Sequence, residues 1–187
     1  MRLGIFGGTL NPIHLGHLVL AETARETLCL DRVLFIPTGR PPHKSATRLL
    51  PGAVRLEMVQ LAIHGHPAFD ASAIEITRSG PSYTIDTIKS LHTQWPRAKL
   101  FLVIGQDLLT VRWLAWDEIT RLCTVVVASR PGVAKPAHQR GVIWLSMPPM
   151  AIASSEIRAR VKAGRSIRYL VPSAVERFIH QRRVYRT

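Results

Sequence analysis

The sequence predicts an α/β fold in which a parallel sheet is doubly wound, with helices on both faces. Two observations carry this prediction. Short, continuous apolar runs, such as those at 33–37 and 100–104, alternate with longer segments whose apolar residues recur at helical spacing. A strand that is apolar at every position is buried on both faces, which is typical of parallel sheets covered by helices.

The predicted elements follow one another without a repeat, a low-complexity tract or a linker. We therefore expect one domain over 1–187, ending in a small helical part whose last helix begins at Pro172. Strands are expected at 3–6, 33–37, 69–77, 100–104, 124–128 and 142–145. Helices are expected at 16–28, 53–64, 84–94, 108–122, 155–163 and 172–182.

The net charge is the unusual bulk property. Twenty-five basic and twelve acidic residues give +13, an excess that favours nucleic acid, anionic membranes or phosphorylated small molecules as partners. A basic, solvated surface explains the same charge without any ligand. The basic residues are partly concentrated near the C-terminus, at Arg158, Arg160, Lys162, Arg165, Arg168, Arg177, Arg182, Arg183 and Arg186.

The length of the apolar runs and the surroundings of the two cysteines indicate the cellular compartment. No apolar run approaches the roughly 18–20 residues of a membrane span, and the first residues do not form a signal peptide. Cys29 and Cys123 lie in apolar surroundings without metal-type spacing, so we expect two buried thiols. These observations predict a cytoplasmic protein without a membrane partner.

The segment that follows the first strand predicts an anion site. Gly7 and Gly8 end the strand, and the helix begins near Gly16, so backbone N–H groups and a helix dipole can point at one anion. His14 and His17 lie at this junction, where both rings can donate N–H groups to phosphate oxygens. A single histidine is more often structural, but a pair flanking a glycine behind a glycine loop favours binding.

A second anion site is predicted near the C-terminus. Ser154 and Ser155 precede a helix whose first turn carries Arg158. A serine cap leaves backbone N–H groups free to bind phosphate. The guanidinium of Arg158 adds a planar, permanently charged set of donors. The alternative is an ordinary helix cap beside a surface arginine.

Five further positions suggest a second ligand. The loop 38–52 is long for a compact α/β domain and carries His43 and Lys44, either as a phosphate clamp or as a solvated basic loop. Tyr83 and Thr84 begin a helix, where a carboxylate meets free amides and the positive end of a dipole. Trp116 offers a face to a cationic ring, or packs in the core.

Several of these motifs together resemble a known family. The run Gly-Gly-Thr-Leu-Asn-Pro-Ile-His-Leu-Gly-His at 7–17 resembles the signature of the HxGH nucleotidyltransferase superfamily. The nearest match is to the bacterial nicotinate-nucleotide adenylyltransferases, because of the Gly-Pro-Ser-Tyr-Thr-Ile-Asp-Thr block at 80–87. The resemblance extends over nearly the whole chain, through 41–44, 105–107, Trp113 with Trp116, and 152–158. The family usually has Ser at the position of Ala153.

The resemblance implies a Rossmann-like fold and transfer of the adenylyl group of ATP to nicotinate mononucleotide, giving deamido-NAD and pyrophosphate. It implies Mg²⁺ that bridges ATP phosphates and is not held in a protein cage. The catalytic residues would be His14, His17 and Arg158. ATP would be bound by Gly7, Gly8, Thr9, His14, His17, Gly105, Ser154, Ser155 and Arg158. Nicotinate mononucleotide would be bound by His43, Lys44, Tyr83, Thr84, Asp107 and Trp116.

Two alternatives remain open from the sequence. One keeps the fold and changes the acceptor to nicotinamide mononucleotide or another phosphorylated compound, although the 80–87 block argues against pantetheine phosphate. The other is a basic nucleic-acid-binding module, motivated by the charge. We expect nucleic acid to be the weaker candidate, because no stacking motif, helix-turn-helix signal or zinc spacing is present. A homo-oligomer is compatible with the sequence but not predicted by it.

Overall fold

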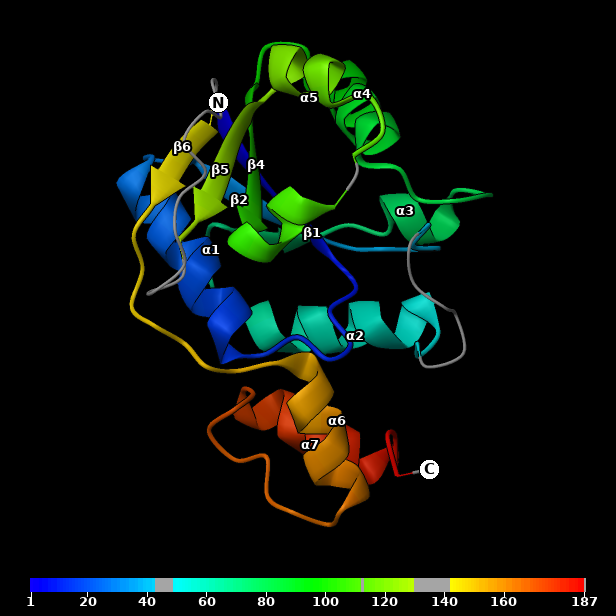
Figure 1. The fold of residues 1–187 in the computed structure, drawn as a ribbon. Coiled ribbons are helices and arrows are strands. Elements are labelled where there is room, and N and C mark those ends of the chain that lie inside the picture. The colour runs from blue at the N-terminus through cyan, green and yellow to red at the C-terminus, as the bar shows by residue number, and fades with distance from the viewer. Residues whose placement is uncertain (43–48, 112, 130–141, 187) are drawn as a thin grey trace.

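The computed structural model describes residues 1–42, 49–111, 113–129 and 142–186. Their centre is a six-stranded, all-parallel sheet with the order β3-β2-β1-β4-β5-β6 (Figure 1). This confirms the predicted doubly wound, Rossmann-like sheet. The strands are β1 (Arg2–Gly8), β2 (Arg32–Pro37), β3 (Phe69–Ala71), β4 (Lys99–Gly105), β5 (Thr124–Ala128) and β6 (Val142–Leu145).

Helices cover both faces of the sheet. α1 and α2 lie on one face and α4 and α5 on the other, while α6 and α7 form a C-terminal part next to α2 (Figure 1). The bounds are α1 (Leu15–Thr27), α2 (Gly52–Ile63), α3 (Ile74–Thr77), α4 (Thr84–Gln94), the 3-10 helix η2 (Gln106–Thr110), α5 (Trp116–Leu122), α6 (Ser154–Lys162) and α7 (Ser173–Gln181). No described helix is long and apolar enough to cross a membrane.

Alternate residues of each strand enter two separate cores. Phe6 and Phe35 pack with α1, α2 and the C-terminal helices, whereas Ile5 and Leu34 pack with α4 and α5. Successive side chains of a strand point to opposite faces, so a strand that is apolar throughout supplies both cores. This is the physical reason for the continuous apolar runs in the sequence.

Two predicted elements differ from the observed ones. The strand expected at 69–77 ends at Ala71, because the chain turns after Ser72 donates its N–H to Phe35, and 74–77 form the short helix α3. The helix expected at 108–122 is broken, because Ala115 has a left-handed φ of 56° that cannot continue an α-helix. That break separates η2 from α5 and leaves Trp113 in the connecting segment.

The prediction of two buried cysteines is half wrong. Cys123 is buried at the end of α5, and burial raises the pKa of its thiol to about 12. Cys29 is exposed, because it follows the end of α1 at a left-handed φ of 48° in the turn that leads to β2. An apolar sequence neighbourhood does not decide burial where the backbone turns.

One charged residue that the sequence did not single out is fully buried. Arg55 on α2 is 1% exposed, and its guanidinium donates to three backbone carbonyls. The acceptors are Leu50 at 2.9 Å, Thr9 at 2.8 Å and Thr38 at 2.6 Å. Arg55 therefore joins the segments that follow β1 and β2 to the start of α2.

We expect Arg55→Met to lower the free energy of unfolding by about 3–5 kcal/mol, since it leaves three carbonyls without their donor. Urea denaturation measures this loss, with Gln60→Met, an exposed change on the same helix, as the matched control. A loss below about 1 kcal/mol would mean that water replaces the guanidinium without penalty.

Candidate active site

The site lies where the strand order reverses, at the carboxyl ends of β1 and β4. A cavity of about 440 Å³ opens there between the end of β1, the start of α1, the end of β4 and the start of α6. All nine residues predicted to bind ATP line this one cavity: Gly7, Gly8, Thr9, His14, His17, Gly105, Ser154, Ser155 and Arg158.

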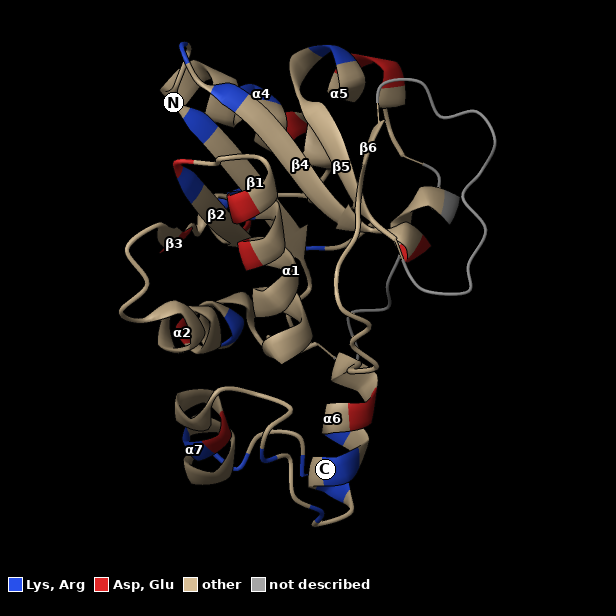
Figure 2. Cartoon of the chain, turned by 90° about the vertical axis from the view of Figure 1, so that its left-hand side faces the viewer, with Lys and Arg blue, Asp and Glu red and all other residues tan. Residues whose placement is uncertain are grey.

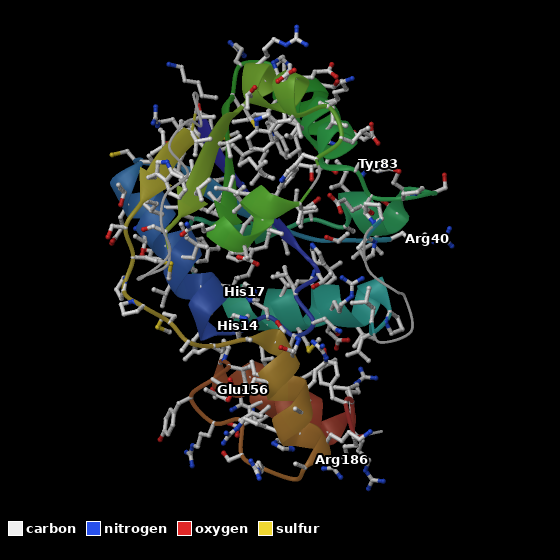
Figure 3. The ribbon with its side chains drawn as sticks, viewed as in Figure 1. His14, His17, Arg40, Tyr83, Glu156 and Arg186 are labelled. Carbon is white, nitrogen blue, oxygen red and sulfur yellow. The ribbon has the colours of Figure 1, made fainter. Side chains whose placement is uncertain are left out.

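The two histidines form a stacked pair. Their ring centroids are 3.6 Å apart, with 23° between the ring planes, and Figure 3 shows them together at the start of α1. His17 Nδ1 accepts the backbone N–H of His14 at 3.2 Å, so the proton of a neutral His17 ring is carried by Nε2. Gly16 permits this arrangement, since a Cβ there would lie 3.1 Å from His14 Nδ1.

The histidine pair is electrically neutral near pH 7. Burial lowers the pKa of His14 to about 4. Burial also lowers the pKa of His17 well below its ordinary value, and the neighbouring His14 lowers it further. A bound polyanion would favour the protonated rings and so raise the pKa of both histidines. The neutral pair could therefore become positively charged when such a ligand binds.

The C-terminal part reaches the cavity through α6. Arg158 Nη1 donates to the carbonyl of Asn11 at 2.9 Å, which holds the guanidinium at the cavity wall. The predicted serine cap is wrong: the N-cap residue is Ala153, and Ser154 Oγ instead donates to the carbonyl of Pro12 at 2.8 Å. The hydroxyl therefore attaches α6 to the loop after β1.

A residue near the chain end completes this attachment and was missed from the sequence. Tyr185 donates its hydroxyl to Asn11 Oδ1 at 2.7 Å, and Asn11 is only 2% exposed. Burial raises the pKa of Tyr185, which keeps the phenol protonated as a donor. A tyrosine 174 positions away from its partner gives no local signal, so sequence reasoning could not have paired them.

A second cavity, of about 200 Å³, lies on the other side of the β1 end. Tyr83 and Thr84 line it at the start of α4, and Trp113 lines it from the segment between η2 and α5. In Figure 3 Tyr83 lies near α3, away from the histidine pair. The two cavities share five lining residues: Gly7, Gly8, Thr9, Ile104 and Leu108.

The remaining predicted acceptor residues lie elsewhere. Asp107 lines the first cavity with the ATP residues, close to Gly105, where a Cβ would lie 2.6 Å from its carboxylate. Trp116 is partly buried beside Trp113, with ring centroids 5.7 Å apart, and does not line either cavity. His43 and Lys44 lie outside the described residues.

The acceptor side also contains a buried acid that the sequence did not single out. Glu75 on α3 is 7% exposed and lines the second cavity with Ser82 and Thr87. Burial raises the pKa of Glu75, although hydrogen bonds from Thr87 and Ser82 and the charge of Arg78 oppose the shift. The only sequence signal was an acid set between two isoleucines.

Metal binding by the protein itself has no obvious site in the described ranges. Among these residues, no group of three or more His, Cys, Asp or Glu side chains could hold a metal ion. Asp107 is the one acidic residue among those that line the first cavity.

Comparisons with known proteins show the family of the chain. A family model described as cytidylyltransferase-like matches residues 5–160. A probable nicotinate-nucleotide adenylyltransferase of Thermus thermophilus is 43% identical over 188 residues, covering all of both chains. Its counterpart in Geobacter sulfurreducens is 42% identical over 212 residues, covering 99% of this chain and 98% of that protein. The chain belongs to the cytidylyltransferase-like family, among its nicotinate-nucleotide adenylyltransferases.

Solved structures of this family share the fold. A Plasmodium falciparum nicotinic acid mononucleotide adenylyltransferase complexed with NaAD superposes with a TM-score of 0.83 at 16% identity, covering 98% of this chain and 97% of that one. A putative nicotinate-nucleotide adenylyltransferase from Vibrio parahaemolyticus gives 0.74 at 21% identity, covering 100% and 96%. At these identities the likeness establishes the fold.

The buried histidines predict how stability depends on pH. A pKa of about 4 for His14 in the folded chain, against 6.5 when unfolded, means that the unfolded chain binds more protons between these values. Stability is therefore fully present above pH 6.5 and lost towards pH 4, by about 3 kcal/mol from His14.

Denaturant unfolding at several pH values measures this loss. The double variant His14→Asn/His17→Asn removes both titrating rings, so its stability should fall less steeply with acid than that of the parent chain. His92→Asn, an exposed change on α4, controls for the substitution. Equal slopes for the parent and the double variant would contradict the assignment.

Proposed function

We propose that the chain transfers the adenylyl group of ATP to nicotinate mononucleotide, releasing pyrophosphate and forming deamido-NAD. The observation that carries this proposal is the pair of cavities that share Gly7, Gly8 and Thr9. One cavity contains the histidine pair and Arg158, and the other contains the helix start at Tyr83 and Thr84. Two substrates bound in them would meet at the end of β1.

The first cavity supplies what a triphosphate needs. His14, His17 and Arg158 are donors from two different helices, and Gly7 has open space where a side chain would project. Donors fixed before the reaction stabilise the charge that spreads over the α-phosphate and the leaving pyrophosphate. Arg158 and the histidine rings would therefore act on the transition state.

The second cavity suits an anionic ring. The start of α4 carries backbone N–H groups and the positive end of the helix dipole, both of which attract a carboxylate. An uncharged carboxamide gains less from either. This difference favours nicotinate over nicotinamide mononucleotide as the acceptor.

The reaction needs no general base from the protein. The acceptor phosphate, with a second pKa of about 6, is already dianionic in part near pH 7. Its oxygen attacks the α-phosphorus in line, one phosphorus–oxygen bond forms, and the bond to pyrophosphate breaks. Catalysis then consists of positioning and charge stabilisation by fixed groups.

Mg²⁺ would enter with ATP rather than occupy a protein cage. The donors in the first cavity are mostly N–H groups, which suit phosphate oxygens, and Asp107 is the carboxylate placed to contact a hydrated cation there. The cation would neutralise charge on the phosphates. We place the reaction in the cytoplasm, where we expect its substrates.

A pyrophosphate-release assay tests the proposed function. ATP is supplied with nicotinate mononucleotide, nicotinamide mononucleotide or pantetheine phosphate, and kcat/KM is compared. We expect nicotinate mononucleotide to be the best acceptor. A higher value for either of the other two would replace it as the substrate, and no release with any acceptor would refute adenylyl transfer.

His17→Ala should lower kcat by about a hundredfold or more while changing the KM for ATP by less than about threefold, since its donor acts on the transition state. Steady-state kinetics at saturating acceptor separates the two parameters. His92→Ala, on the exposed side of α4, is the control. A loss confined to KM would make His17 a binding residue only.

Thr84→Pro tests the helix-start carboxylate site. Thr84 is the first residue of α4, where proline is tolerated, and Tyr83 already has the extended conformation that precedes proline (φ −89°, ψ 135°). The variant removes one backbone N–H, so the preference for nicotinate over nicotinamide mononucleotide should fall by about tenfold.

The matched control is Thr84→Ala, which keeps the N–H and removes the side chain. Its preference should stay close to that of the parent chain. If Thr84→Pro retains the full preference, the amide at this position does not receive the carboxylate.

A further inference from the structure

Three polar side chains form a cluster beside the acceptor cavity, two of them buried in its wall and the third half-buried behind them. They are Glu75 on α3, Thr87 on α4 and Arg78 from the segment between these helices, and we call them the Glu75–Thr87–Arg78 cluster. Thr87 donates its hydroxyl proton to Glu75 Oε1 at 2.7 Å, and Arg78 Nη2 donates to the same hydroxyl at 3.0 Å. The Thr87 hydroxyl therefore bridges a carboxylate and a guanidinium.

The cluster holds together the segments that shape the acceptor cavity. Besides Thr87, the Glu75 carboxylate accepts hydrogen bonds from the Ser82 hydroxyl and the Gly39 N–H. Ser82 in turn exchanges hydrogen bonds with the backbone of Arg40, at 2.8 and 3.0 Å. No side chain fits at Gly39, since a Cβ there would overlap the carbonyl oxygen of Glu75. Glu75 thus joins the chain after β2 to the chain before α4.

Arg78 places a positive charge at the start of α4. Its Nη2 lies 3.5 Å from the carbonyl oxygen of Tyr83, the N-cap residue of that helix. Its Nη1 is buried and has no hydrogen-bond partner within the described part of the chain. The guanidinium is therefore not fully occupied by protein acceptors, and its charge acts on its surroundings.

The positive charge of Arg78 opposes a repulsion between two carboxylates in the acceptor site. Glu75 and Thr84 line the same cavity, so a buried carboxylate of the protein shares it with the proposed site for the substrate carboxylate. Two like charges in poorly hydrated surroundings repel each other more strongly than in water. Arg78 is the cation that Thr87 links directly to Glu75, and its charge acts on that carboxylate together with that of the buried Arg55.

We propose that Arg78 is a positioning residue that determines acceptor specificity. Bridged by Thr87, its guanidinium offsets the charge of Glu75 and keeps the start of α4 attractive to a pyridine nucleotide that carries a ring carboxylate. This inference rests on the proposed function and extends it to residues with no assigned contact to the substrates. It adds a second cause for the preference for nicotinate over nicotinamide mononucleotide, besides the backbone amides of Tyr83 and Thr84.

The experiment compares four variants with the parent chain: Arg78→Met, Arg78→Lys, Glu75→Gln and the double variant Glu75→Gln/Arg78→Met. Met removes the charge at similar length, Lys keeps it, and Gln keeps the shape of the glutamate without its charge. Arg97→Met, an exposed change beyond the other end of α4, is the matched control. Each protein is assayed by pyrophosphate release with nicotinate and with nicotinamide mononucleotide, and the ratio of kcat/KM values is the readout.

Arg78→Met should lower kcat/KM for nicotinate mononucleotide by about tenfold and that for nicotinamide mononucleotide by less than about threefold, mainly through KM. Arg78→Lys should keep the ratio within about threefold of the parent value, since it keeps the charge. Glu75→Gln should raise the ratio, because it removes the repulsion and leaves the cation. The double variant should return the ratio towards the parent value.

If Arg78→Met lowers kcat/KM equally for both acceptors, Arg78 has only a structural role and the proposal is overturned. A lower ratio of kcat/KM values in Glu75→Gln than in the parent chain would overturn it as well. Circular dichroism and thermal unfolding establish that each variant folds. If Arg78→Met does not fold, Glu75→Gln and Arg78→Lys decide by the direction of their ratios. A parent chain that releases no pyrophosphate with either nucleotide refutes the proposed function itself, a result that does not depend on the variants.

Discussion

The loop after β1 is held by side chains that donate to its backbone carbonyls, and the site depends on these hydrogen bonds. Arg55 donates to Thr9, and Arg158 donates to Asn11. Ser154 adds a third bond, to Pro12. The donors come from α2 and α6, so the loop that would carry ATP is fixed from two directions. Leu10 and Ile13 of the same loop are buried in the core, so apolar packing and these hydrogen bonds together hold it.

The position of this loop follows from the strand order. β1 lies between β2 and β4 in the sheet. The chain leaves β1 through α1 on one face, and it enters β4 from α4 on the other face. The chain therefore separates beyond β1 and leaves space on both sides of Gly7 and Gly8. A two-substrate reaction needs two adjoining spaces, and the reversal of strand order supplies both without a second domain.

The electrostatics of the site differ from those of the surface. The molecule carries a formal charge of +13, and Figure 2 shows many Lys and Arg residues on α6 and along the C-terminal part. Inside the first cavity, however, the histidines are neutral because burial lowers the pKa of both. At the wall of the second, the buried Glu75 is joined through the Thr87 hydroxyl to Arg78, which lies outside the cavity. Surface charge attracts anions in general, whereas we propose that these inner groups discriminate among them.

Local patterns determined most of the fold and half of the site. Strands buried on both faces must be apolar throughout, so their positions and the parallel sheet were predictable. The turn at Gly7 and Gly8 and the pair His14 and His17 lie within a few residues of each other, so the part of the site that we propose for ATP could be predicted from them. The short β3 and the break at Ala115 were not predictable, because the turn at Ser72 and a left-handed residue overrode the pattern of apolar residues.

Tertiary structure decided the remaining parts of the fold and the site, because those parts depend on contacts between separate segments of the chain. Arg55 has the sequence context of any surface arginine, and only the carbonyls that converge on it explain its burial. Tyr185 reaches Asn11 from the other end of the chain. Glu75 and Arg78 meet only through Thr87 on the next helix. The sequence by itself was enough to propose a chemistry for the first seventeen residues, because those groups are neighbours in the chain. The packing of later helices decided which side chains hold that segment in place.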